Sequence, residues 1–554
     1  MVLLNQYEIT MQEYLKQQIA RTLKKLAPDL DIPEITIEKP RSPEHGDAAT
    51  NVALTLAKAL KDNPRSIAQK IADNMDLSSG FIREVEVAGP GFINFRFADN
   101  WLAGQLAEVH RTGREFGRGR MLKGKKIQVE FVSANPTGPL TVGHGRNAVL
   151  GDTIARVLEW AGADVQREYY FNNAGRQMRV LAESVRARYL QAVGKQVEFP
   201  EGGYEGAYIT GIAEKVKQQH GDSLIGEEHL PVFRKAAEDE IFEDIRRTLS
   251  RMNITMDSFF NENTLYENGS IDKVIATLRN QELVYEQDGA TWFKTTAFGK
   301  DKDTVLIKST GEPTYRLPDI AYHINKLDRG FDLAIDVFGA DHIATYPDVV
   351  SAVRACGYDS DRIDVIVYQF VTIVKDGKPF KMSTRKANFV TLDELMDEVG
   401  ADVTRFFFLM RAPGTHLEFD LNEAKQAGEK NPVFYLQYAH ARIQSIMRKV
   451  RDNYDFSGKA PDFNLLVHEA EITLIKRILE FPDVILMTAG QREPHKLIQY
   501  LNELATAFHK FYHDCRILGV AEPLALARTE LLTVTATVLA NGLGILGISA
   551  PDKM

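Results

Sequence analysis

Residues 130–152 read EFVSANPTGPLTVGHGRNAVLGD, and this stretch decides which fold we expect. Just before it, apolar and polar residues alternate over 127–131, which is typical of a strand. A loop rich in Asn, Pro and Gly follows, and apolar residues then recur at helical spacing over 150–161. A second alternating segment covers 165–171. This strand–loop–helix–strand order predicts a parallel sheet with a right-handed crossover.

The chain has 554 residues, which is too long for one hydrophobic core because cores stop growing at roughly 250–300 residues. We therefore expect a multidomain α/β protein. Residues 1–110 have the pattern of a separate α+β domain. Residues 120–410 are expected to form a Rossmann-like parallel-sheet domain with a charged, mostly helical insertion at about 185–290. Residues 411–554 are helical in pattern throughout, which predicts an all-α helix bundle.

Individual elements are expected within these domains. In the first domain the patterns predict helices at 11–26, 48–60 and 67–75 and a strand pair at 85–97. Further strands are expected at 304–308, 333–338 and 365–374.

Composition excludes several classes of protein. The net charge of −9 argues against a uniformly basic nucleic-acid coat but allows a local basic track. Cys356 and Cys515 are the two cysteines, and no CxxC occurs, so we expect no disulfide framework and no zinc site. The first residues lack a signal-peptide pattern. The apolar stretch 531–550 contains threonines, an asparagine and glycines, which predicts a packed helix and a turn in a cytoplasmic protein without a membrane partner.

The TVGH segment (141–144) lies where a parallel sheet presents ligands, between the end of a strand and the start of a helix. A helix N-terminus offers unpaired N–H groups to phosphate. Gly143 leaves room for a flat base, and His144 can donate a hydrogen bond to a phosphate oxygen. The alternative is that this Gly-His pair is a structural cap or turn.

Two further loops are candidates for the same site. In GADH (339–342), Gly339 permits close approach of a ligand to the backbone, and Asp341 could hold ribose hydroxyls. In KMSTR (381–385), the basic and hydroxyl side chains could cover a triphosphate and stabilise departing pyrophosphate. Each loop taken alone could equally be a solvated surface turn.

Together the three loops resemble, in order and spacing, the HIGH, GxDQ-like and KMSKS signatures of class I aminoacyl-tRNA synthetases. Longer strings resemble the arginyl-tRNA synthetases over almost the whole chain, with 185–290 the weakest part. They are SPEHGDAATNVALTLAK (42–58), VAGPGFINF (87–95), EFVSANPTGPLTVGHGRNAVLGD (130–152), YYFNNAGRQM (169–178), KSTGEPTYRLPDIAYH (308–323), KMSTRKANFVTLDEL (381–395), THLEFDLNEAKQ (415–426), NPVFYLQYAHARI (431–443), FYHDCRILG (511–519) and LANGLGILGISAPDKM (539–554).

The resemblance implies an ATP site and catalytic residues. ATP would be bound by Thr141, Gly143, His144, Gly339, Asp341, His342, Lys381, Met382, Ser383 and Arg385, and the catalytic residues would be Thr141, His144, Lys381 and Ser383. Two positions depart from the family pattern: Thr141 replaces the first histidine of the HIGH signature, and Thr384 replaces a lysine of the KMSKS loop. Lys381, Arg385 or Lys386 would then carry the phosphate-binding role.

The resemblance also implies an arginine pocket made by Glu130, Asn135, Tyr315 and Asp319. A guanidinium requires carboxylates and planar partners in a fixed fork, and Asp319 is the expected acceptor. Tyr315 precedes it by four residues, so both side chains are expected to face one cavity. The alternatives are a helix N-cap for Asp319, a sheet-edge salt bridge for Glu130, and bonds from Asn135 to its own loop.

The reaction implied is activation of L-arginine by ATP with Mg²⁺, followed by transfer to the 2′-hydroxyl of the terminal adenosine of tRNA for arginine, tRNA(Arg). Activation in this family generally waits for bound tRNA. We expect a monomer. A compact nucleotidyltransferase-like enzyme is disfavoured by the KMSTR loop and the long helical C-terminus. A catalytically impaired tRNA-binding paralogue is the alternative that Thr141 and Thr384 leave open.

Residues for tRNA binding are likewise implied by the resemblance. Phe92 and Asn94 match positions that touch the outer corner of tRNA. Near the anticodon loop the match places Tyr438, Arg442, Tyr512 and Met554. The alternative for Phe92 and the two tyrosines is a place in a hydrophobic core. His440, His509 and His513 are interpreted as structural.

Overall fold

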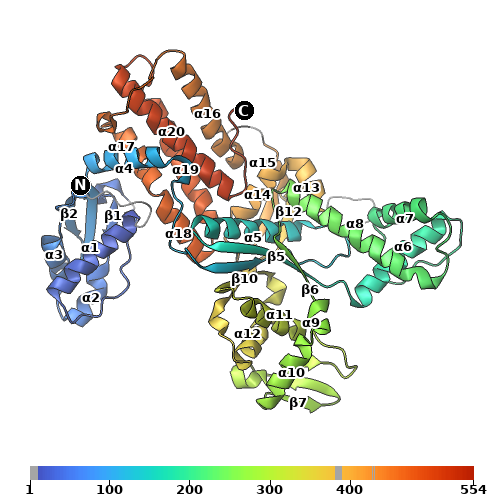
Figure 1. The fold of residues 1–554 in the computed structure, drawn as a ribbon. Helices are drawn as coiled ribbons and strands as arrows, with labels where there is room; N and C mark the ends of the chain where they lie inside the picture. Colours follow the sequence, from blue (N-terminus) through green and yellow to red (C-terminus); the bar gives the residue numbers. More distant parts are fainter. Residues whose placement is uncertain (1–9, 41, 381–389, 427, 429–430) are drawn as a thin grey trace.

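The computed structural model describes residues 10–40, 42–380, 390–426, 428 and 431–554. A five-stranded parallel sheet lies at its centre (Figure 1), in the order β11-β10-β4-β5-β6. Its strands are β4 (Lys126–Glu130), β5 (Asp164–Phe171), β6 (Ser258–Asn261), β10 (Leu333–Gly339) and β11 (Ile363–Tyr368). The chain starts in the middle strand, moves outward to one edge, and then returns to build the other half. This is the doubly wound order, so the predicted parallel sheet is confirmed.

Helices cover the two faces of this sheet. α5 (Val142–Trp160) is the crossover from β4 to β5, and α11 (Arg316–Asp328) packs on the face opposite, ahead of α12 (Tyr346–Ala355). α5 can approach closely because Gly151 lies against the Phe131 ring, where a Cβ atom would come within 2.2 Å of Cγ. This close packing sets where the first turn of α5 meets the sheet.

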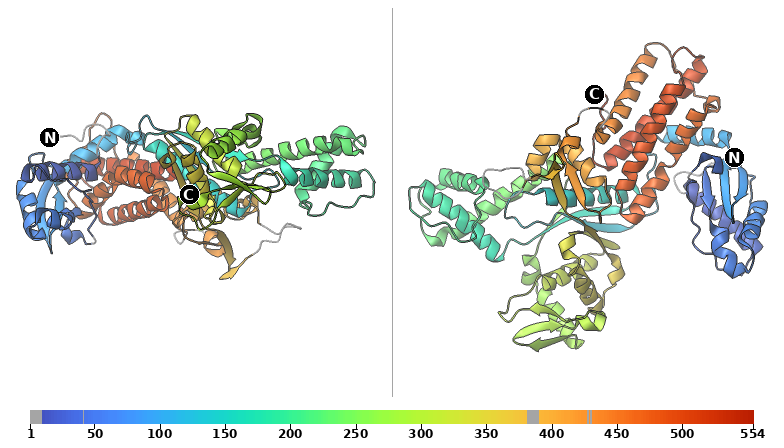
Figure 2. Two further views of the ribbon diagram at one scale, coloured as in Figure 1. Left: turned by 90° about the horizontal axis from the view of Figure 1, so that it is seen from below. Right: turned by 180° about the vertical axis from the view of Figure 1, so that it is seen from behind.

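The structure differs from the expected single insertion at 185–290, because β6 lies inside that range and belongs to the central sheet. One excursion precedes β6 and forms the helical projection seen in Figures 1 and 2. It contains α6 (Gly175–Ala192), α7 (Ala207–His220) and α8 (Leu230–Arg251). A second excursion follows β6, with α9 (Asn263–Glu267), α10 (Ser270–Asn280), β7 (Val284–Gln287), β8 (Ala290–Phe293) and β9 (Thr304–Ile307). β6 has four half-buried residues, too short a run for its pattern to stand out.

The strand expected at 365–374 is two strands in different sheets. β11 ends at Tyr368, and β12 (Val371–Lys375) pairs with β13 (Lys378–Pro379) and β14 (Leu417–Asp420). The apolar run is interrupted at Gln369, whose carbonyl accepts a hydrogen bond from the Arg146 guanidinium and whose N–H donates to Pro413. β14 also corrects the prediction that the chain is helical throughout after residue 410. β9, likewise, belongs to the separate β7-β8-β9 sheet.

The N-terminal region is an antiparallel sheet, β1-β3-β2, packed against helices. It contains α1 (Met11–Leu26), β1 (Ala48–Thr50), α2 (Val52–Leu60), α3 (Pro64–Asn74), β2 (Ile82–Ala88), β3 (Phe92–Phe97) and α4 (Asp99–Thr112). The strand pair around the Gly-Pro-Gly turn is confirmed. The helix expected from residue 48 begins only after β1.

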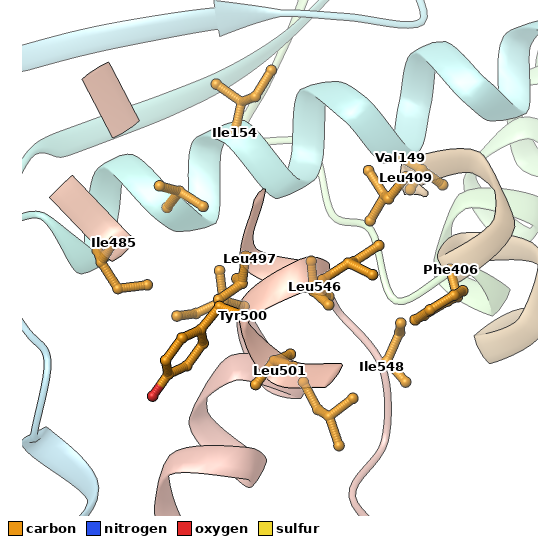
Figure 3. Packing of buried hydrophobic residues seen from close by; sticks show 14 of the residues in the cluster. Val149, Ile154, Phe406, Leu409, Ile485, Leu497, Tyr500, Leu501, Leu546 and Ile548 are labelled. Carbon is orange, nitrogen blue, oxygen red and sulfur yellow. The ribbon is translucent and has the colours of Figure 1, made fainter. Parts of the chain in front are cut away.

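The C-terminal part is a bundle of long helices that packs on the back of α5. Its elements are α13 (Leu392–Val399), α14 (Ala401–Leu409), α15 (Leu421–Ala424), α16 (Pro432–Arg451), α17 (Glu469–Leu479), α18 (Phe481–Gln491), α19 (His495–Asp514) and α20 (Glu522–Ile545). Figure 3 shows Val149 of α5 beside Leu409, on the side of the helix where Leu497 and Leu546 lie, whereas Ile154 lies on the opposite side of α5. α20 is long and apolar enough to cross a membrane by length and composition, but 61% of its most apolar window is buried in the protein. The predicted packed helix is therefore confirmed.

Arg405 of α14 joins three parts of the chain. It is fully buried, and its guanidinium donates to the carbonyls of Leu546 and Met252, each at 2.7 Å, and to Asp152 Oδ2 at 2.7 Å. The C-terminal bundle, the end of the helical projection and α5 are thus tied to one side chain. Short 3₁₀ helices complete the fold: η1 (Pro43–His45), η2 (Gly113–Glu115), η3 (Glu227–His229), η4 (Thr295–Phe298), η5 (Ala340–His342), η6 (Ser360–Arg362) and η7 (Phe463–Leu465).

Candidate functional site

The carboxyl ends of β4 and β10 mark the switch point of the sheet, where the chain leaves neighbouring strands in opposite directions. A ligand-binding crevice forms at such a point. Thr141 is the N-cap of α5, and its backbone N–H donates to His144 Nδ1 at 3.1 Å, with Thr141 Oγ1 3.2 Å from the same nitrogen. The first turn of α5 therefore opens directly onto the crevice.

This geometry sets the tautomer of His144. Because Nδ1 accepts the Thr141 N–H bond, the ring proton is carried by Nε2. Burial lowers the pKa of His144, so the imidazole is neutral near pH 7 and Nε2–H is its donor. Thr141, which departs from the family pattern, thus helps to orient His144.

The KMSTR segment (381–385) falls within residues 381–389, which lie outside the described residues, so the structure does not place Lys381, Met382, Ser383 and Arg385. The residues that follow it in the chain, 390–392, contact the TVGH segment. The Leu392 N–H donates to the Leu140 carbonyl at 2.8 Å, and the Val142 N–H donates to Val390 at 3.3 Å. Thr391 forms a bridge with Thr141. Residues 390–392, which follow in the chain, are therefore fastened to the TVGH segment.

The GADH segment follows β10, next to β4. Gly339 ends the strand, and a Cβ atom there would lie 2.5 Å from Asp341 Oδ1. The His342 ring stacks on Phe338 with centroids 5.0 Å apart. The side chains of Asp341 and His342 are 66% and 50% exposed. Asp341 is thus accessible from the crevice edge.

A row of carboxylates crosses the sheet below this crevice. Glu130 of β4 is in register with Glu168 of β5 and with Asp336 of β10, so the three side chains emerge on one face. Glu168 and Asp336 are fully buried, and Glu130 is 4% exposed. Like charges on neighbouring strands repel one another, so this row requires nearby cations.

Helix α11 supplies these cations. Lys326 Nζ lies 2.6 Å from Glu130 Oε2 and also bonds Asp336. His323 Nε2 lies 2.8 Å from Asp336 Oδ2. Arg329 donates to both oxygens of Glu168, at 2.6 and 2.7 Å. The sequence patterns did not indicate this network, although Asp319, His323 and Lys326 are spaced four and three residues apart, as on one face of a helix.

Glu130 and Asn135 are both placed beside the crevice. Glu130 is in a central strand and not at a sheet edge, but the salt bridge of that alternative is present, to Lys326 at 2.6 Å; Ser133 Oγ donates to its second oxygen at 2.8 Å. Asn135 Oδ1 accepts from the Asn172 N–H at 3.1 Å, and Nδ2 donates to Gln177 Oε1 at 3.2 Å. Asn135 therefore ties its loop to the segment after β5 rather than to itself.

Asp319 lies in α11 on the wall of a small cavity that it shares with His323, Phe338, His342, Tyr346 and Val365. Within the described part of the chain no donor bonds its carboxylate. The pKa of Asp319 is raised to about 7, first by burial and also by Glu130 and Glu262, against the opposing effect of His323 and Lys326. The helix N-cap is Tyr315, so the N-cap alternative for Asp319 is wrong.

Tyr315 does not share the cavity of Asp319, which corrects the prediction from their spacing. Its side chain is 79% exposed, whereas that of Asp319 is turned inward. The Asp319 N–H does bond the Tyr315 carbonyl at 3.3 Å. Tyr315 precedes the first full turn, however, and its cap position turns the ring toward solvent.

A second group of candidate residues meets on the C-terminal bundle. The Arg442 guanidinium of α16 lies 4.5 Å from the Tyr512 ring of α19 and 5.6 Å from the Tyr438 ring. His509 stacks on Tyr438 with centroids 6.5 Å apart. We call these four residues the aromatic–arginine cluster. Tyr512 is 37% exposed and Tyr438 is half-buried, so neither is a core residue.

Of the remaining residues that were predicted to contact tRNA, two lie at the surface and one is buried. Met554 is 58% exposed and Phe92 37%, so both are available at the surface. Asn94 is 6% exposed, because β3 is the central strand and Ala49 and Glu86 flank Asn94 on both sides. The contact of Asn94 with tRNA stays a prediction, for a side chain that is almost covered in the free chain. The structural interpretation of two histidines stands: His440 bonds the Pro551 carbonyl and His513 bonds Asp514, whereas His509 belongs to the cluster.

Three family profiles match the chain in order. "Arginyl tRNA synthetase N terminal domain" matches residues 13–97, "tRNA synthetases class I (R), catalytic domain" matches 112–407, and "DALR anticodon binding domain" matches 436–554. The arginine–tRNA ligase of Salinibacter ruber is 55% identical over 98% of this chain and 100% of its own. The chain belongs to the arginyl-tRNA synthetases. The arginine–tRNA ligase of Desulfotalea psychrophila is 50% identical to this chain, over 94% of each of the two chains.

Solved structures of arginyl-tRNA synthetases share the whole architecture. The enzyme of Thermus thermophilus superposes with a TM-score of 0.78 at 25% identity, over 98% of this chain and 100% of that one. The catalytic-domain profile contains β4 to β11 and the described parts of the candidate crevice, and the aromatic–arginine cluster lies within the DALR profile.

We predict that Asp319→Asn stabilises this synthetase at high pH. The folded protein holds a proton on Asp319 up to a pKa of about 7, whereas the ordinary value is 3.8, so ionisation costs the folded state stability as pH rises through this window. The thermal midpoint of Asp319→Asn, measured relative to the parent from pH 4 to pH 8.5, should rise and level off above pH 7. Asp328→Asn, at an exposed position of the same helix, should show no such trend.

Proposed function

We propose that this synthetase activates L-arginine with ATP and transfers it to tRNA(Arg), with arginine recognised by Asp319. The observation that supports this most directly is the state of the Asp319 carboxylate, which lies beside the switch-point crevice without a donor among the described residues. A guanidinium stays charged at any working pH and donates in a planar fork. Glu130 and Asn135 lie at the end of β4 and in the loop after it, where they would hold the amino-acid end.

ATP would bind over the first turn of α5, with its phosphates at the helix N-terminus and its ribose near Asp341. Gly143 and Gly339 keep backbone atoms within reach of the nucleotide. Mg²⁺ would arrive as part of the MgATP substrate. We assign Lys381, Met382, Ser383 and Arg385 to the triphosphate, because residues 390–392, a few positions later in the chain, pair with Leu140–Val142.

The first step needs no general base, because the arginine carboxylate is already ionised. One of its oxygens attacks the α-phosphorus of ATP, the bond from that phosphorus to the bridging oxygen breaks, and pyrophosphate leaves with the electron pair. The neutral His144 donates Nε2–H to oxygens where negative charge grows, and the α5 dipole adds to this. Placement and charge stabilisation therefore account for the step.

In the second step the 2′-hydroxyl of the terminal adenosine attacks the activated carbonyl, forming the ester and releasing AMP. We assign the aromatic–arginine cluster and Met554 to the anticodon loop, and Phe92 to the outer corner of tRNA. Aromatic rings stack on unpaired bases, and an arginine between them adds charge for the backbone. We further propose that activation requires bound tRNA and that the protein works as a cytoplasmic monomer.

The catalytically impaired paralogue finds no support in the described site. Thr141, which motivated that alternative, orients His144 by a hydrogen bond. Arginine-dependent pyrophosphate exchange with ATP and added tRNA(Arg) distinguishes the two. Absence of exchange with each of the twenty amino acids would leave only the binding function.

Replacing Asp319 with Asn should abolish arginine activation, because an amide can neither balance the guanidinium charge nor accept two of its N–H bonds. We expect arginine-dependent pyrophosphate exchange to fall by at least about 100-fold, since a charged hydrogen bond of 2–3 kcal/mol is lost. Binding of tRNA(Arg), measured by filter retention, should persist. Unchanged KM for arginine would refute the assignment of Asp319 as the guanidinium acceptor.

Replacing His144 with Ala should lower kcat of pyrophosphate exchange by about 10²–10³, the loss found when one donor to a developing anion is removed. KM for arginine should stay within a few-fold, because His144 faces phosphate rather than the amino acid. Thr141→Val, which removes only the hydroxyl contact and leaves the backbone N–H, should have a much smaller effect. An equal loss in both variants would contradict the role given to Nε2–H.

Arg442→Gln should raise KM for tRNA(Arg) by about tenfold, because a phosphate contact and a cation–π partner of two tyrosines are lost together. kcat for pyrophosphate exchange at saturating tRNA should be unchanged. Arg448→Gln provides the control, since Arg448 is exposed on the same helix outside the cluster. A salt dependence of tRNA binding that is identical in the parent and Arg442→Gln would count against a phosphate contact by Arg442.

A further inference from the structure

The arginine pocket borders four ionisable side chains that form one closed network. Glu130 and Asp336 are register partners on adjacent strands, and both are buried. Lys326 Nζ lies between them, at 2.6 Å from Glu130 and in contact with Asp336, and it is itself completely buried. His323 closes the network on the other oxygen of Asp336.

The geometry at His323 requires both ring nitrogens to carry protons. Nδ1 lies 2.7 Å from the Asp319 carbonyl oxygen, which can only accept, and Nε2 lies 2.8 Å from the Asp336 carboxylate. A doubly protonated imidazole satisfies both contacts. The network therefore contains two anions, Glu130 and Asp336, and two cations, His323 and Lys326, and its net charge is zero.

The pKa shifts of Asp336, His323 and Lys326 agree with this charge distribution, whereas burial and the charge of Asp336 raise the pKa of Glu130 against the opposing effect of Lys326 and His323. Burial would raise the pKa of Asp336, but Lys326 and His323 hold it below its usual value. Burial would lower the pKa values of His323 and Lys326, but Asp336 raises both. Each of the two cations also lowers the pKa of Asp319, the carboxylate assigned to the guanidinium.

We propose that Lys326 and His323 are positioning residues for arginine: by neutralising Glu130 and Asp336, they keep Glu130 in place and leave Asp319 as the carboxylate whose charge the bound guanidinium balances. This inference rests on the proposed function. Neither cation touches the expected path of ATP, because their polar atoms bond residues of the sheet and of α11 itself. They act through the carboxylates, and they set the pH range in which the pocket accepts a cation.

Several titratable groups surround Asp319 and share this control. His323 and Lys326 lie on its own helix, and Glu130, Glu262, Tyr170, Tyr266 and His342 face it from other elements. Glu262 accepts bonds from Tyr170 and Asn172, so part of its charge is already balanced. His323 and Lys326 are therefore the groups whose replacement changes the charge beside Asp319 without removing a proposed ligand of arginine.

The test is the pH profile of kcat/KM for L-arginine in tRNA-dependent pyrophosphate exchange, from pH 5.5 to 8.5, with the full chain. The parent should lose activity on the acid side as Asp319 takes up a proton near pH 7. In Lys326→Met this loss of activity on the acid side, the acid limb of the profile, should occur at a pH about one unit higher, because a cation near Asp319 has been removed. His323→Gln should move it in the same direction. KM for ATP should stay within about twofold in both.

The double variant Lys326→Met with Asp336→Asn separates a charge effect from a folding defect. It removes one cation and one anion, so the network is neutral again, and the acid limb should return toward that of the parent. Arg167→Met is the matched control: it removes an ion-paired cation of the same sheet, 2.6 Å from Glu159, and should lower the thermal midpoint without moving the limb.

The outcomes distinguish the two proposals. An upward shift in Lys326→Met and His323→Gln that the double variant reverses supports the positioning role. The positioning role is overturned if the acid limb does not move in His323→Gln and in whichever Lys326 variants fold. It is also overturned if the acid limb of the double variant is shifted as far as that of the single variant. If the parent itself shows no arginine-dependent exchange, the proposed function fails, independently of these variants.

Discussion

Three buried carboxylates in register across β5, β4 and β10 are the constraint on which the catalytic region depends. Glu168, Glu130 and Asp336 cannot be buried as charges without cations, because an unpaired buried ion costs several kcal/mol. Arg329, Lys326 and His323 meet this requirement from one face of α11. The helix is therefore held on the sheet at a specific rotation and height, and Asp319, one turn earlier on that face, is brought to the crevice.

Helix α5 connects this crevice to the rest of the molecule. Its first turn presents His144 at the switch point, and further along the helix Val149 is buried beside Leu409 of α14 (Figure 3). Arg405 adds a polar connection between the bundle and Asp152 on α5. The surface assigned to tRNA thus rests on the same helix that orients the imidazole assigned to ATP. This shared support is a physical route by which a bound tRNA can affect the nucleotide loop.

The local patterns predicted elements well where the chain alternates or repeats over several residues. The parallel sheet, the strand pair around the Gly-Pro-Gly turn and the long apolar C-terminal helix are examples. Prediction was wrong where an element is short or where a distant side chain interrupts a run. β6 has four residues, and the run across Gln369 divides because Arg146, far away in sequence, bonds its carbonyl. The burial of Asn94 was not predicted because its strand is central, and strand order is a property of the whole sheet.

The sequence alone indicated the class of fold and, through its resemblance to the arginyl-tRNA synthetases, the candidate residues for ATP and for arginine. These features are local, because a glycine, a histidine or an aspartate in a motif is identified from the residues next to it in the sequence. The protonation states and the side-chain orientations of those residues depend on the tertiary structure. The partners of Glu130 and Asp336 lie on a helix that follows β4 by almost two hundred residues, and neither burial nor register across a parallel sheet can be read from one strand alone. The charge state of a group in a low-dielectric interior depends on every charge near it. The cationic network of Lys326 and His323 could therefore be identified only from the folded structure.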